Sequence, residues 1–499
     1  MANLATHFAQ FRDGIVGNNH IFNGPYGPKR ILYADWTASG RMYAPIEKAM
    51  QEQVYAYVGN THTESTVTGS RTTSAYHEAV HIIKAHVNAC ESDVFISSGS
   101  GMTGAVNKFQ RILGFRLSNE YQKAVQLEGA ARPIVFVTHM EHHSNQTSWI
   151  ETIAEVVVIG QTEEGRVDLD DLDRLLEVYK DRWVKIAAVT ACSNVTGIET
   201  PYHEIARRMH HADGLCFVDF ACSGPYVKID MHPEDEDCRL DAIYFSPHKF
   251  LGGPGTSGIL IFNKALYLNT VPDCPGGGTV EWTNPWGGHR YLEDIEARED
   301  GGTPPFLQTI RTALSVRLKE AMGMENIRVH EHHLLERFWN KLIHIPGLHI
   351  LADNIQDRLP VVSFYIEDLH YNLAVKLLND RYGIQVRGGC SCAGTYGHFL
   401  LHVGPEMSSS ITESISKGDM TYKPGWVRAS LHPTMTEEEV DFISHAIEEV
   451  VANHQEWKQD YEYDPFVNEF THKNQPSMHE EVRDIFKSIK PQQEAFVLS

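Results

Sequence analysis

The sequence predicts an α/β protein, with a mostly parallel seven-stranded sheet in a large domain and a smaller C-terminal α+β domain. Two observations carry this prediction. Short apolar runs bounded by turn residues recur between residues 90 and 265, and several of the intervals between them have helical periodicity. Alternating strands and helices build a largely parallel sheet that helices cover on both faces, so its strands can be apolar throughout. The seven runs begin at Val94, Ile134, Glu155, Lys185, Leu215, Ala242 and Gly258.

Helical patterns accompany these strands and continue beyond them. They lie at 45–57, 76–87, 169–179, 201–212, 306–322, 324–343 and 370–380, and again from Thr436 onward. Strand-like runs at 359–366 and 425–432 alternate with the later helices. This second group of elements predicts the small α+β unit.

A segment rich in glycine and proline, from Pro272 to Pro305, interrupts the alternation and predicts the domain boundary. We therefore expect a large domain over 31–300 and a small domain over 301–455. Residues 1–30 are expected to join the small domain. The polar, weakly periodic residues 456–499 are expected to form a C-terminal extension.

Composition restricts the classes of partner. The chain has 499 residues and a formal charge of −22, which repels phosphate backbones and anionic lipid, so neither nucleic acid nor a membrane is expected as a partner. Because no run approaches the roughly 20 apolar residues of a membrane span and no leader pattern opens the chain, a cytoplasmic protein is expected. The eight cysteines, mostly within apolar runs, predict reduced thiols, and the scattered 28 histidines predict no dedicated metal site.

The segment FSPHKFLGGPGTSGILIF places Lys249 between a strand and a glycine-rich turn. Ligand crevices in open α/β sheets lie at the carboxyl ends of strands, where a lysine with an accessible neutral amine can form a Schiff base. Ser246 and His248 stand beside it and could bind a phosphate. Taken alone, the pattern also fits a solvated loop lysine.

Two further strand ends carry polar groups. Asp219 ends the run LCFVDF, a costly place for a carboxylate unless it meets a cation or a strong donor, although a helix N-cap is an alternative. After the run IVFVT, His142 and His143 could stack on a flat aromatic cofactor or lie at the surface. Asn194 follows another strand.

The segment SSGSGMTGAVNKF, with Gly99, Gly101, Thr103 and Gly104, is typical of an anion cradle at a helix N-terminus. The cradle, histidine, asparagine, aspartate and lysine thus follow one another at successive strand ends. Polar surface residues that are unrelated to one another would not be expected to follow that order. The order instead indicates one composite site.

The order and the residues of these motifs resemble those of the class V aminotransferase fold of fold type I pyridoxal phosphate enzymes, and within it the cysteine desulfurase and selenocysteine lyase family. Its members typically read EHH or EHK, SNxxG, VDxAQ, SxHKxxGPxGxG, RxGxxC and RxSxxxYNTxEE. This chain reads EHHSN, SNVTG, VDFAC, SPHKFLGGPGTSG, RGGCSC and VRASLHPTMTEEE, over roughly residues 30–450.

The resemblance implies a cofactor, pyridoxal 5'-phosphate, and a role for each matching residue. Lys249 would form the Schiff base, Asp219 would pair with the pyridinium nitrogen, and His142 would stack on the ring. Cys392 matches the catalytic cysteine, and Arg428 would bind the substrate carboxylate. The remaining implied contacts are Ser246, His248, Thr103, Gly101 and Met102 at the phosphate, Asn194 and Cys222 near the ring oxygen, with Asn194 also near the substrate, and Thr303 at the phosphate of a neighbouring subunit. A homodimer follows from the last of these.

The chain departs from the family pattern at several positions. Cys222 replaces the usual glutamine, Gly104 replaces a usual glutamate, and Cys390 adds a second thiol near Cys392. The glycines before Cys390 predict a mobile loop. The long segment at 393–424 is expected to form a lid or to fill part of the substrate cleft.

The expected activity is removal of sulfur or selenium from a cysteine-type amino acid, giving alanine and an enzyme persulfide on Cys392, with a possible sulfur-acceptor protein as partner. A β-eliminating C–S lyase, or an epimerase or aminotransferase of the same fold, remains an alternative. A noncatalytic scaffold or sulfur carrier is a further one, against which the intact Lys249, Asp219, His142 and Arg428 argue.

Overall fold

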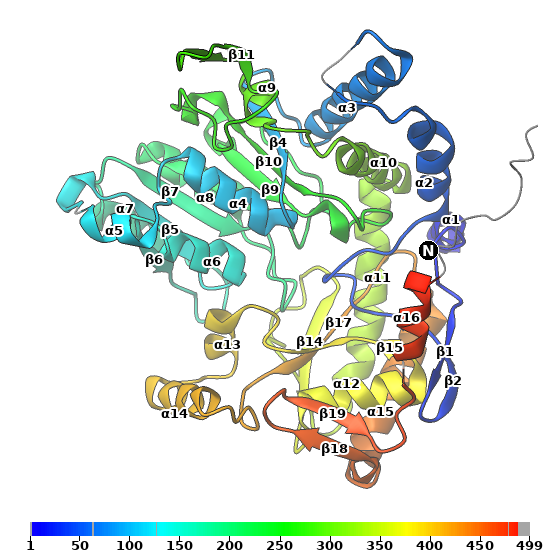
Figure 1. Ribbon diagram of the computed structural model, residues 1–499. Coiled ribbons are helices and arrows are strands. Elements are labelled where there is room, and N and C mark those ends of the chain that lie inside the picture. Colours follow the sequence, from blue (N-terminus) through cyan, green and yellow to red (C-terminus); the bar gives the residue numbers. More distant parts are fainter. Residues whose placement is uncertain (1, 62–63, 126, 478, 488–499) are drawn as a thin grey trace, which may run out of the picture.

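The computed structural model describes residues 2–61, 64–125, 127–477 and 479–487, and two sheets organise this part of the chain (Figure 1). The seven predicted strands form one sheet, which confirms the predicted α/β class. In spatial order they are β4 (Asp93–Ser98), β10 (Gly258–Asn263), β9 (Ala242–Phe245), β8 (Leu215–Asp219), β7 (Lys185–Thr190), β5 (Ile134–Thr138) and β6 (Glu155–Ile159). Strand β10 is antiparallel to both of its neighbours, and the other pairs are parallel.

The strands are apolar throughout because both faces of the sheet are covered. Alternate residues of one strand enter two different buried clusters: Phe217 packs with the helix α4 (Gly101–Ile112), whereas Cys216 and Val218 pack with α7 (Leu169–Val178) and α8 (Tyr202–His211). The helix α6 (His143–Ile150) adds Trp149 to the α4 side. Since the strands are parallel apart from β10, the carboxyl ends of β4, β5, β7, β8 and β9 share one edge of the sheet.

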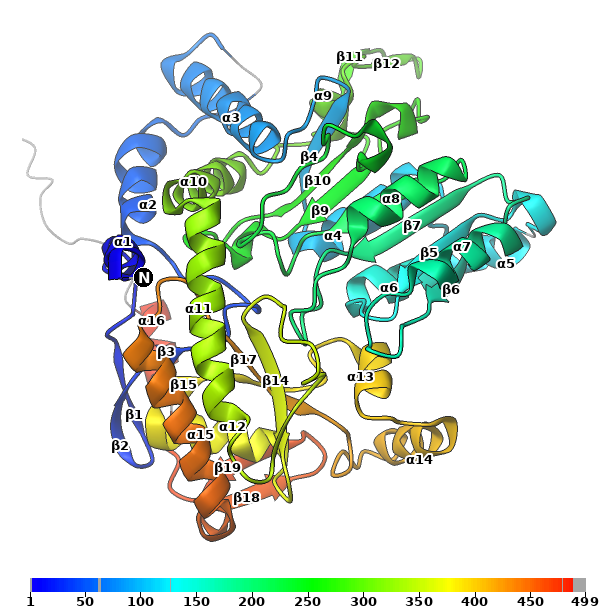
Figure 2. The same ribbon diagram turned by 180° about the vertical axis from the view of Figure 1, so that it is seen from behind.

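The second, smaller sheet is antiparallel and has the order β13 (Leu348–Ile350), β14 (Val361–Ile366), β17 (Trp426–Ser430) and β16 (Arg387–Gly389). The helices packed around it are α11 (Met324–Leu342), α12 (Tyr371–Tyr382) and α15 (Glu437–Trp457) (Figure 2). Thr436 begins α15 with a capping box, in which its side chain and that of Glu439 each bond the other's backbone N–H.

The N-terminal residues connect the two sheets. Helix α1 (Ala2–Arg12) packs on α11 and on α10 (Phe306–Met322), which in turn packs along α3 (Val67–His86). The short strand β3 (Leu32–Tyr33) pairs in parallel with β15 (Ile384–Gln385). Directly after β3, Asp35 forms a parallel bridge with Ser430 of β17. The chain therefore passes from β3 along the smaller sheet toward the carboxyl edge of the larger one.

The remaining elements lie around these two sheets. They include two hairpins, β1 (Ile21–Gly24) with β2 (Gly27–Arg30) and β11 (Val280–Thr283) with β12 (His289–Tyr291), and the short helices α2 (Ala44–Ala49), α5 (Asn119–Ala124) and α9 (Ile295–Glu299). No helix in the described ranges is long and apolar enough to cross a membrane.

One segment differs from the sequence-based expectation, and another contains secondary structure that its weak periodicity did not predict. The glycines before Cys390 do not lie in a mobile loop, because Gly388 and Gly389 belong to β16 and pair with β17. The polar segment after residue 456 contains a hairpin, β18 (Tyr461–Asp464) with β19 (Glu469–His472), and the helix α16 (His479–Lys487). In the long segment after Cys392, the helices α13 (Gly394–Leu400) and α14 (Pro405–Ser416) extend beside the smaller sheet (Figure 1).

Candidate active site

A cavity of about 190 Å³ lies at the carboxyl edge of the large sheet, next to β16 and β17. Residues from the ends of five strands meet residues of the smaller sheet there. The predicted site residues that line it are Gly101, Met102, Thr103, His142, Asn194, Asp219, Cys222, Ser246, His248, Lys249, Cys392 and Arg428. Sequence reasoning did not assign a role to several other lining residues, among them Arg387, Ser144 and Thr190.

One end of the cavity is built like an anion cradle. Gly101 begins α4 with φ of +62°, and a Cβ placed there would come within 2.9 Å of the Ser246 Oγ. That oxygen accepts a 2.8 Å hydrogen bond from the backbone N–H of Met102. The Thr103 hydroxyl meets the Ser144 hydroxyl at 2.6 Å. A helix N-terminus with hydroxyl groups and an open glycine approach suits a phosphate group.

The same turn explains why glycine replaces the family's glutamate at position 104. A Cβ on Gly104 would lie 2.9 Å from the Cα of Gly99, so the turn and the helix approach too closely for any side chain. Gly99 itself has φ of +63°, a conformation that favours glycine. This close packing accounts for the glycine at position 104, where the chain departs from the family pattern.

Lys249 and Asp219 influence each other's ionisation across the cavity. Burial raises the pKa of Asp219 to about 6, against the opposing effects of a 2.7 Å hydrogen bond from the Ala221 N–H and of the Lys249 charge. Burial also lowers the pKa of Lys249, while Cys222 and Asp219 oppose that shift. A lowered pKa gives the Lys249 amine a larger neutral fraction at neutral pH than an ordinary lysine has.

His142 presents a neutral imidazole to the cavity. It is the N-cap of α6, and its Nδ1 accepts a 3.1 Å hydrogen bond from the backbone N–H of Ser144, so this nitrogen carries no proton. Burial, with a smaller effect of the Lys249 charge, lowers the pKa of His142 to about 3. An uncharged ring in this position can lie against a flat aromatic group without electrostatic cost.

The cysteine loop is held at the cavity by its backbone. Ser391 and Cys392 both have positive φ, 52° and 57°, which turns the chain sharply after β16. The Asn194 amide donates to the Ser391 carbonyl at 2.7 Å, and the His143 backbone N–H donates to the Cys392 carbonyl at 2.8 Å. The Cys392 side chain is exposed and lines the cavity, whereas Cys390 is half-buried, packs against the apolar core and lies outside it.

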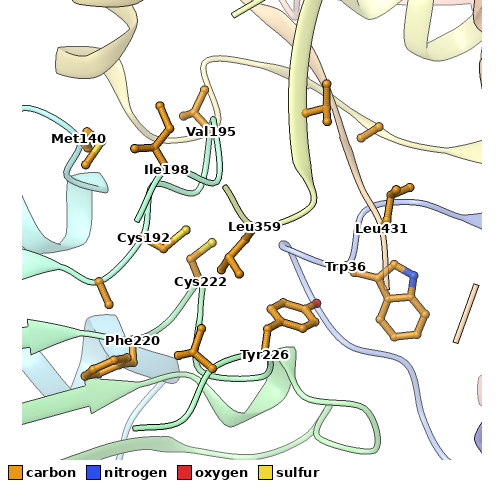
Figure 3. Close-up of a cluster of buried hydrophobic side chains, with 14 of the residues drawn as sticks. Trp36, Met140, Cys192, Val195, Ile198, Phe220, Cys222, Tyr226, Leu359 and Leu431 are labelled. Carbon is orange, nitrogen blue, oxygen red and sulfur yellow. The ribbon is translucent and has the colours of Figure 1, made fainter. Parts of the chain in front are cut away.

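Two other thiols that line the cavity, Cys192 and Cys222, lie side by side (Figure 3). Cys192 and Cys222 are buried, and both sulfurs contact the Ser193 carbonyl, at 3.4 and 3.7 Å. A hydrogen bond from the Cys192 thiol lowers the pKa of Cys222, with a smaller contribution from the Lys249 charge, while burial raises the pKa of Cys192. The position that usually holds a glutamine thus holds a polarised sulfur.

The end of the cavity at β17 contains an ionic cluster. Arg428 is 3% exposed; its Nη1 donates to the Asn194 carbonyl at 3.0 Å, and its Nη2 pairs with Asp35 at 2.7 Å. The Arg428 Nε and the Asn194 Oδ1 are buried and have no hydrogen-bond partner among the described residues. Asp35 is a neighbour that the sequence pattern did not indicate, because it lies almost 400 positions from Arg428 and follows only a two-residue strand.

Thr303 lies apart from this cavity in the single chain. It is exposed in the segment that leads into α10 and is absent from the cavity lining. A larger cavity, of about 860 Å³, lies beside α3 and α9 and reaches the neighbouring Pro304. It contains none of the strand-end groups described above, so we place the chemistry at the smaller cavity.

Comparisons with known proteins agree with this architecture. Among curated relatives, a probable cysteine desulfurase of Streptomyces coelicolor is 26% identical over 73% of this chain and 84% of its own length, and one of Staphylococcus epidermidis is 28% identical over the same shares. Among solved structures, cysteine desulfurases of Thermococcus onnurineus and Escherichia coli superpose with TM-scores of 0.71 and 0.68, at 23% and 21% identity, each covering 89% of this chain and 98% of its own.

The family model described as aminotransferase class-V matches residues 32–443, a range that includes both sheets and every group around the cavity. This match covers most of the chain, and the fold agrees with it. The chain therefore belongs to the aminotransferase class-V family of pyridoxal phosphate-dependent enzymes.

Proposed function

We propose that the cavity binds pyridoxal 5'-phosphate and that the protein is a cysteine desulfurase or selenocysteine lyase. The donor set fits the cofactor. The turn at Gly101, with Met102, Thr103, Ser246 and His248, offers hydroxyl groups and backbone N–H groups for a phosphate. Asp219 is a buried carboxylate that forms no salt bridge with any residue the structure describes, and such a group suits a protonated ring nitrogen.

The unpartnered Asn194 Oδ1 and the polarised Cys222 would face the ring oxygen, and the neutral His142 would lie against the ring. Lys249 would hold the cofactor covalently. When bound, the cofactor supplies an electron sink for negative charge at the substrate Cα. The Lys249 amine would remove and return the substrate Cα proton, for which its lowered pKa is suited.

At the other end of the cavity, Arg428 would bind the substrate α-carboxylate through its free Nε. Cys392 would then attack the substrate sulfur or selenium, so that this atom bonds to the Cys392 Sγ and its bond to the substrate Cβ breaks. The carbon fragment would keep the electron pair of the broken bond and take up a proton at Cβ. The single observation that favours this reaction over elimination is the exposed Cys392 thiol, held at the cavity on a backbone-bonded loop. The products would be alanine and a persulfide on Cys392.

Other parts of the proposal concern assembly and partners. We infer a homodimer in which Thr303 reaches the phosphate of the neighbouring subunit, since Thr303 is exposed and lies outside its own cavity. A sulfur-acceptor protein would take the persulfide from the exposed Cys392. We also infer a cytoplasmic location, where reducing conditions keep thiols such as the exposed Cys90, Cys274 and Cys392 reduced. In this proposal the large domain, 31–300, binds the cofactor, and the small domain, 301–455, carries the cysteine loop and its insertion.

The test is an assay of the holoenzyme with L-cysteine and L-selenocysteine in which alanine, pyruvate and sulfide or selenide are measured separately. We expect alanine, together with a mass increase of one sulfur atom on the peptide that contains Cys392. Pyruvate and ammonia without a persulfide would indicate a β-eliminating C–S lyase instead. Loss of optical activity, or amino transfer to a keto acid, would indicate an epimerase or an aminotransferase.

A further inference from the structure

Three side chains of the kinds that bind transition metals converge away from the active-site cavity. They are Cys90, in the turn between α3 and β4, Asp93, the first residue of β4, and His232, in the segment between β8 and β9. One sulfur, one carboxylate oxygen and one imidazole nitrogen of the three all lie within 4.8 Å of one another. In the described part of the chain, no other histidine, cysteine and acidic side chains form such a group of three.

Hydrogen bonds hold the two segments of this group together without an ion. The Met231 N–H donates to the Val87 carbonyl at 2.9 Å, and the Asn88 side-chain amide donates to the His232 carbonyl at 2.8 Å. Asn88 and His232 lie 144 positions apart in the sequence. The backbone that carries the three side chains is therefore already in place, so an ion would bind without the cost of ordering a loop.

Asp93 lies between the other two residues of the group. Its Oδ2 accepts a 2.7 Å hydrogen bond from the Cys90 N–H and lies 2.6 Å from the His232 Nε2. The Asp93 side chain is fully buried, and its other oxygen, Oδ1, has no hydrogen-bond partner among the described residues. The nearby Lys84 ammonium bonds the Asp93 backbone carbonyl, at 2.6 Å. A buried carboxylate oxygen without a partner is costly unless a cation or a donor reaches it.

The donor set selects the class of metal. A thiol sulfur, an imidazole nitrogen and a carboxylate oxygen suit Zn²⁺, which takes all three kinds of ligand in tetrahedral sites, whereas Ca²⁺ and Mg²⁺ prefer oxygen ligands throughout. The Ser92 hydroxyl lies 2.9 Å from the Cys90 Sγ and could donate a hydrogen bond to a thiolate. Cys90 is exposed and lines the cavity of about 860 Å³ beside α3, which gives an ion a route to the group.

We propose that Cys90, Asp93 and His232 form a zinc site, with water in the fourth position. On binding, the Cys90 thiol would lose its proton to solvent, and the ion would take the place of the proton between the His232 Nε2 and Asp93, so that bonds to sulfur, nitrogen and oxygen form without any change of oxidation state. The scattered histidines predicted no dedicated metal site, because one ligand lies 139 positions from the next. The bound ion would connect the segment before β4 to the segment before β9.

The test titrates zinc chloride into chelator-treated holoenzyme by isothermal titration calorimetry. We expect one strong site per chain, and a higher midpoint of thermal unfolding with zinc, because an ion that binds only the folded state stabilises it. Cys90→Ser removes the sulfur. His232→Gln removes the imidazole but keeps an N–H donor for Asp93. Since even the partners of metal ligands contribute about ten- to hundredfold to affinity, each variant should weaken zinc binding at least about tenfold.

Cys274→Ser is the matched control. Cys274 is also an exposed cysteine next to a carboxylate, that of Asp273 at 3.5 Å, but it belongs to no group of three such ligands in the described ranges, so this variant should keep the wild-type affinity. Cobalt(II) serves as a second probe, because its ligand-field bands in the red, where the cofactor does not absorb, identify tetrahedral ligation. These bands should disappear in Cys90→Ser and persist in Cys274→Ser.

The results have distinct meanings. If either folded variant, Cys90→Ser or His232→Gln, keeps the wild-type affinity, that residue is not a ligand and the proposed site is wrong. Loss of zinc in Cys392→Ser instead would place the ion on the active-site loop, and a wild-type protein without a strong site would also overturn the proposal. Should one variant fail to fold, the other decides. Alanine formation is measured separately, so a failure here leaves the proposed function standing.

Discussion

The backbone carbonyl of Cys392 accepts a 2.8 Å hydrogen bond from the backbone N–H of His143, the residue that follows His142. A second bond runs in the opposite sense, from the Gly394 N–H to the His143 Nε2 at 2.9 Å. The loop with the exposed thiol is therefore attached to the N-terminus of α6, whose N-cap is the imidazole of the cavity. This attachment holds the backbone of the cysteine loop at the edge of the cavity that Cys392 lines.

The first prediction concerns the two thiols of this loop. Cys392→Ser should abolish alanine formation and the persulfide while exchange of the substrate Cα proton with solvent persists, because proton exchange needs Lys249 and not the thiol. Cys390→Ser should have a much smaller effect, since Cys390 packs against the core outside the cavity. Proton NMR in deuterium oxide measures the exchange, and peptide mass spectrometry locates the persulfide.

Two results would contradict this assignment. If Cys390→Ser prevents the persulfide and Cys392→Ser does not, the nucleophile is the other thiol. If Cys392→Ser leaves turnover largely intact and the product is pyruvate, the cofactor expels the sulfur without help from an enzyme thiol, and the reaction is elimination.

The second prediction concerns Lys249 and pH. Because burial lowers its pKa below the ordinary value of 10.5, the neutral amine is present at lower pH than in a surface lysine. Borohydride trapping of pyridoxal phosphate on the apoprotein should therefore label the peptide containing Lys249 with a midpoint below pH 10.5. Lys249→Ala should lose both the label and turnover. Retention of activity in Lys249→Ala, together with a label on a different lysine, would show that another lysine holds the cofactor.

The sequence predicted much of the sheet and of the cavity because the relevant signals are local. Each core strand is a continuous apolar run, and groups such as Asp219 and Lys249 directly follow such runs, so the parallel topology alone brings them to one edge. The close approach of Gly99 and Gly104 also has a local signal, the glycines themselves. The roles assigned to the cavity residues remain predictions.

Long-range and weakly patterned features were not predictable in this way. Asp35 meets Arg428 only because β3 and its neighbours return to β17, and no periodicity in the segment ADWTASG indicates that contact. The hairpin of β18 and β19 lies in a polar stretch, and it is held partly by side-chain bonds such as Tyr461 to Asp380, at 2.9 Å. Gly388 and Gly389 indicated mobility, yet pairing with β17 orders them.

The third prediction concerns the carboxylate end of the cavity. Arg428→Lys keeps the charge but loses the planar fork, including the Nε that has no partner among the described side chains and backbone groups. The loss of a buried charge-assisted pair should cost about 2 to 5 kcal/mol, so KM for L-cysteine should rise at least about thirtyfold. The visible spectrum of the bound cofactor should stay normal. An unchanged KM would exclude Arg428 as the carboxylate ligand.

The last prediction tests whether Thr303 acts across a subunit interface. Thr303 is exposed and lies outside the cavity of its own chain, so Thr303→Arg should fold normally yet fill a partner's phosphate site with a bulky side chain. Thr303→Arg alone and Lys249→Ala alone should each be nearly inactive.

In a mixed dimer, one of the two sites combines an intact Lys249 with the intact Thr303 of the other chain. Mixing the two variants under conditions of subunit exchange should therefore restore up to about a quarter of the wild-type activity, because half of the dimers are mixed and each has one complete site. If Thr303 served its own chain, every site would contain either Lys249→Ala or Thr303→Arg, and mixing would restore nothing. Activity measured against the mixing ratio, with size-exclusion chromatography to verify the dimer, distinguishes the two arrangements.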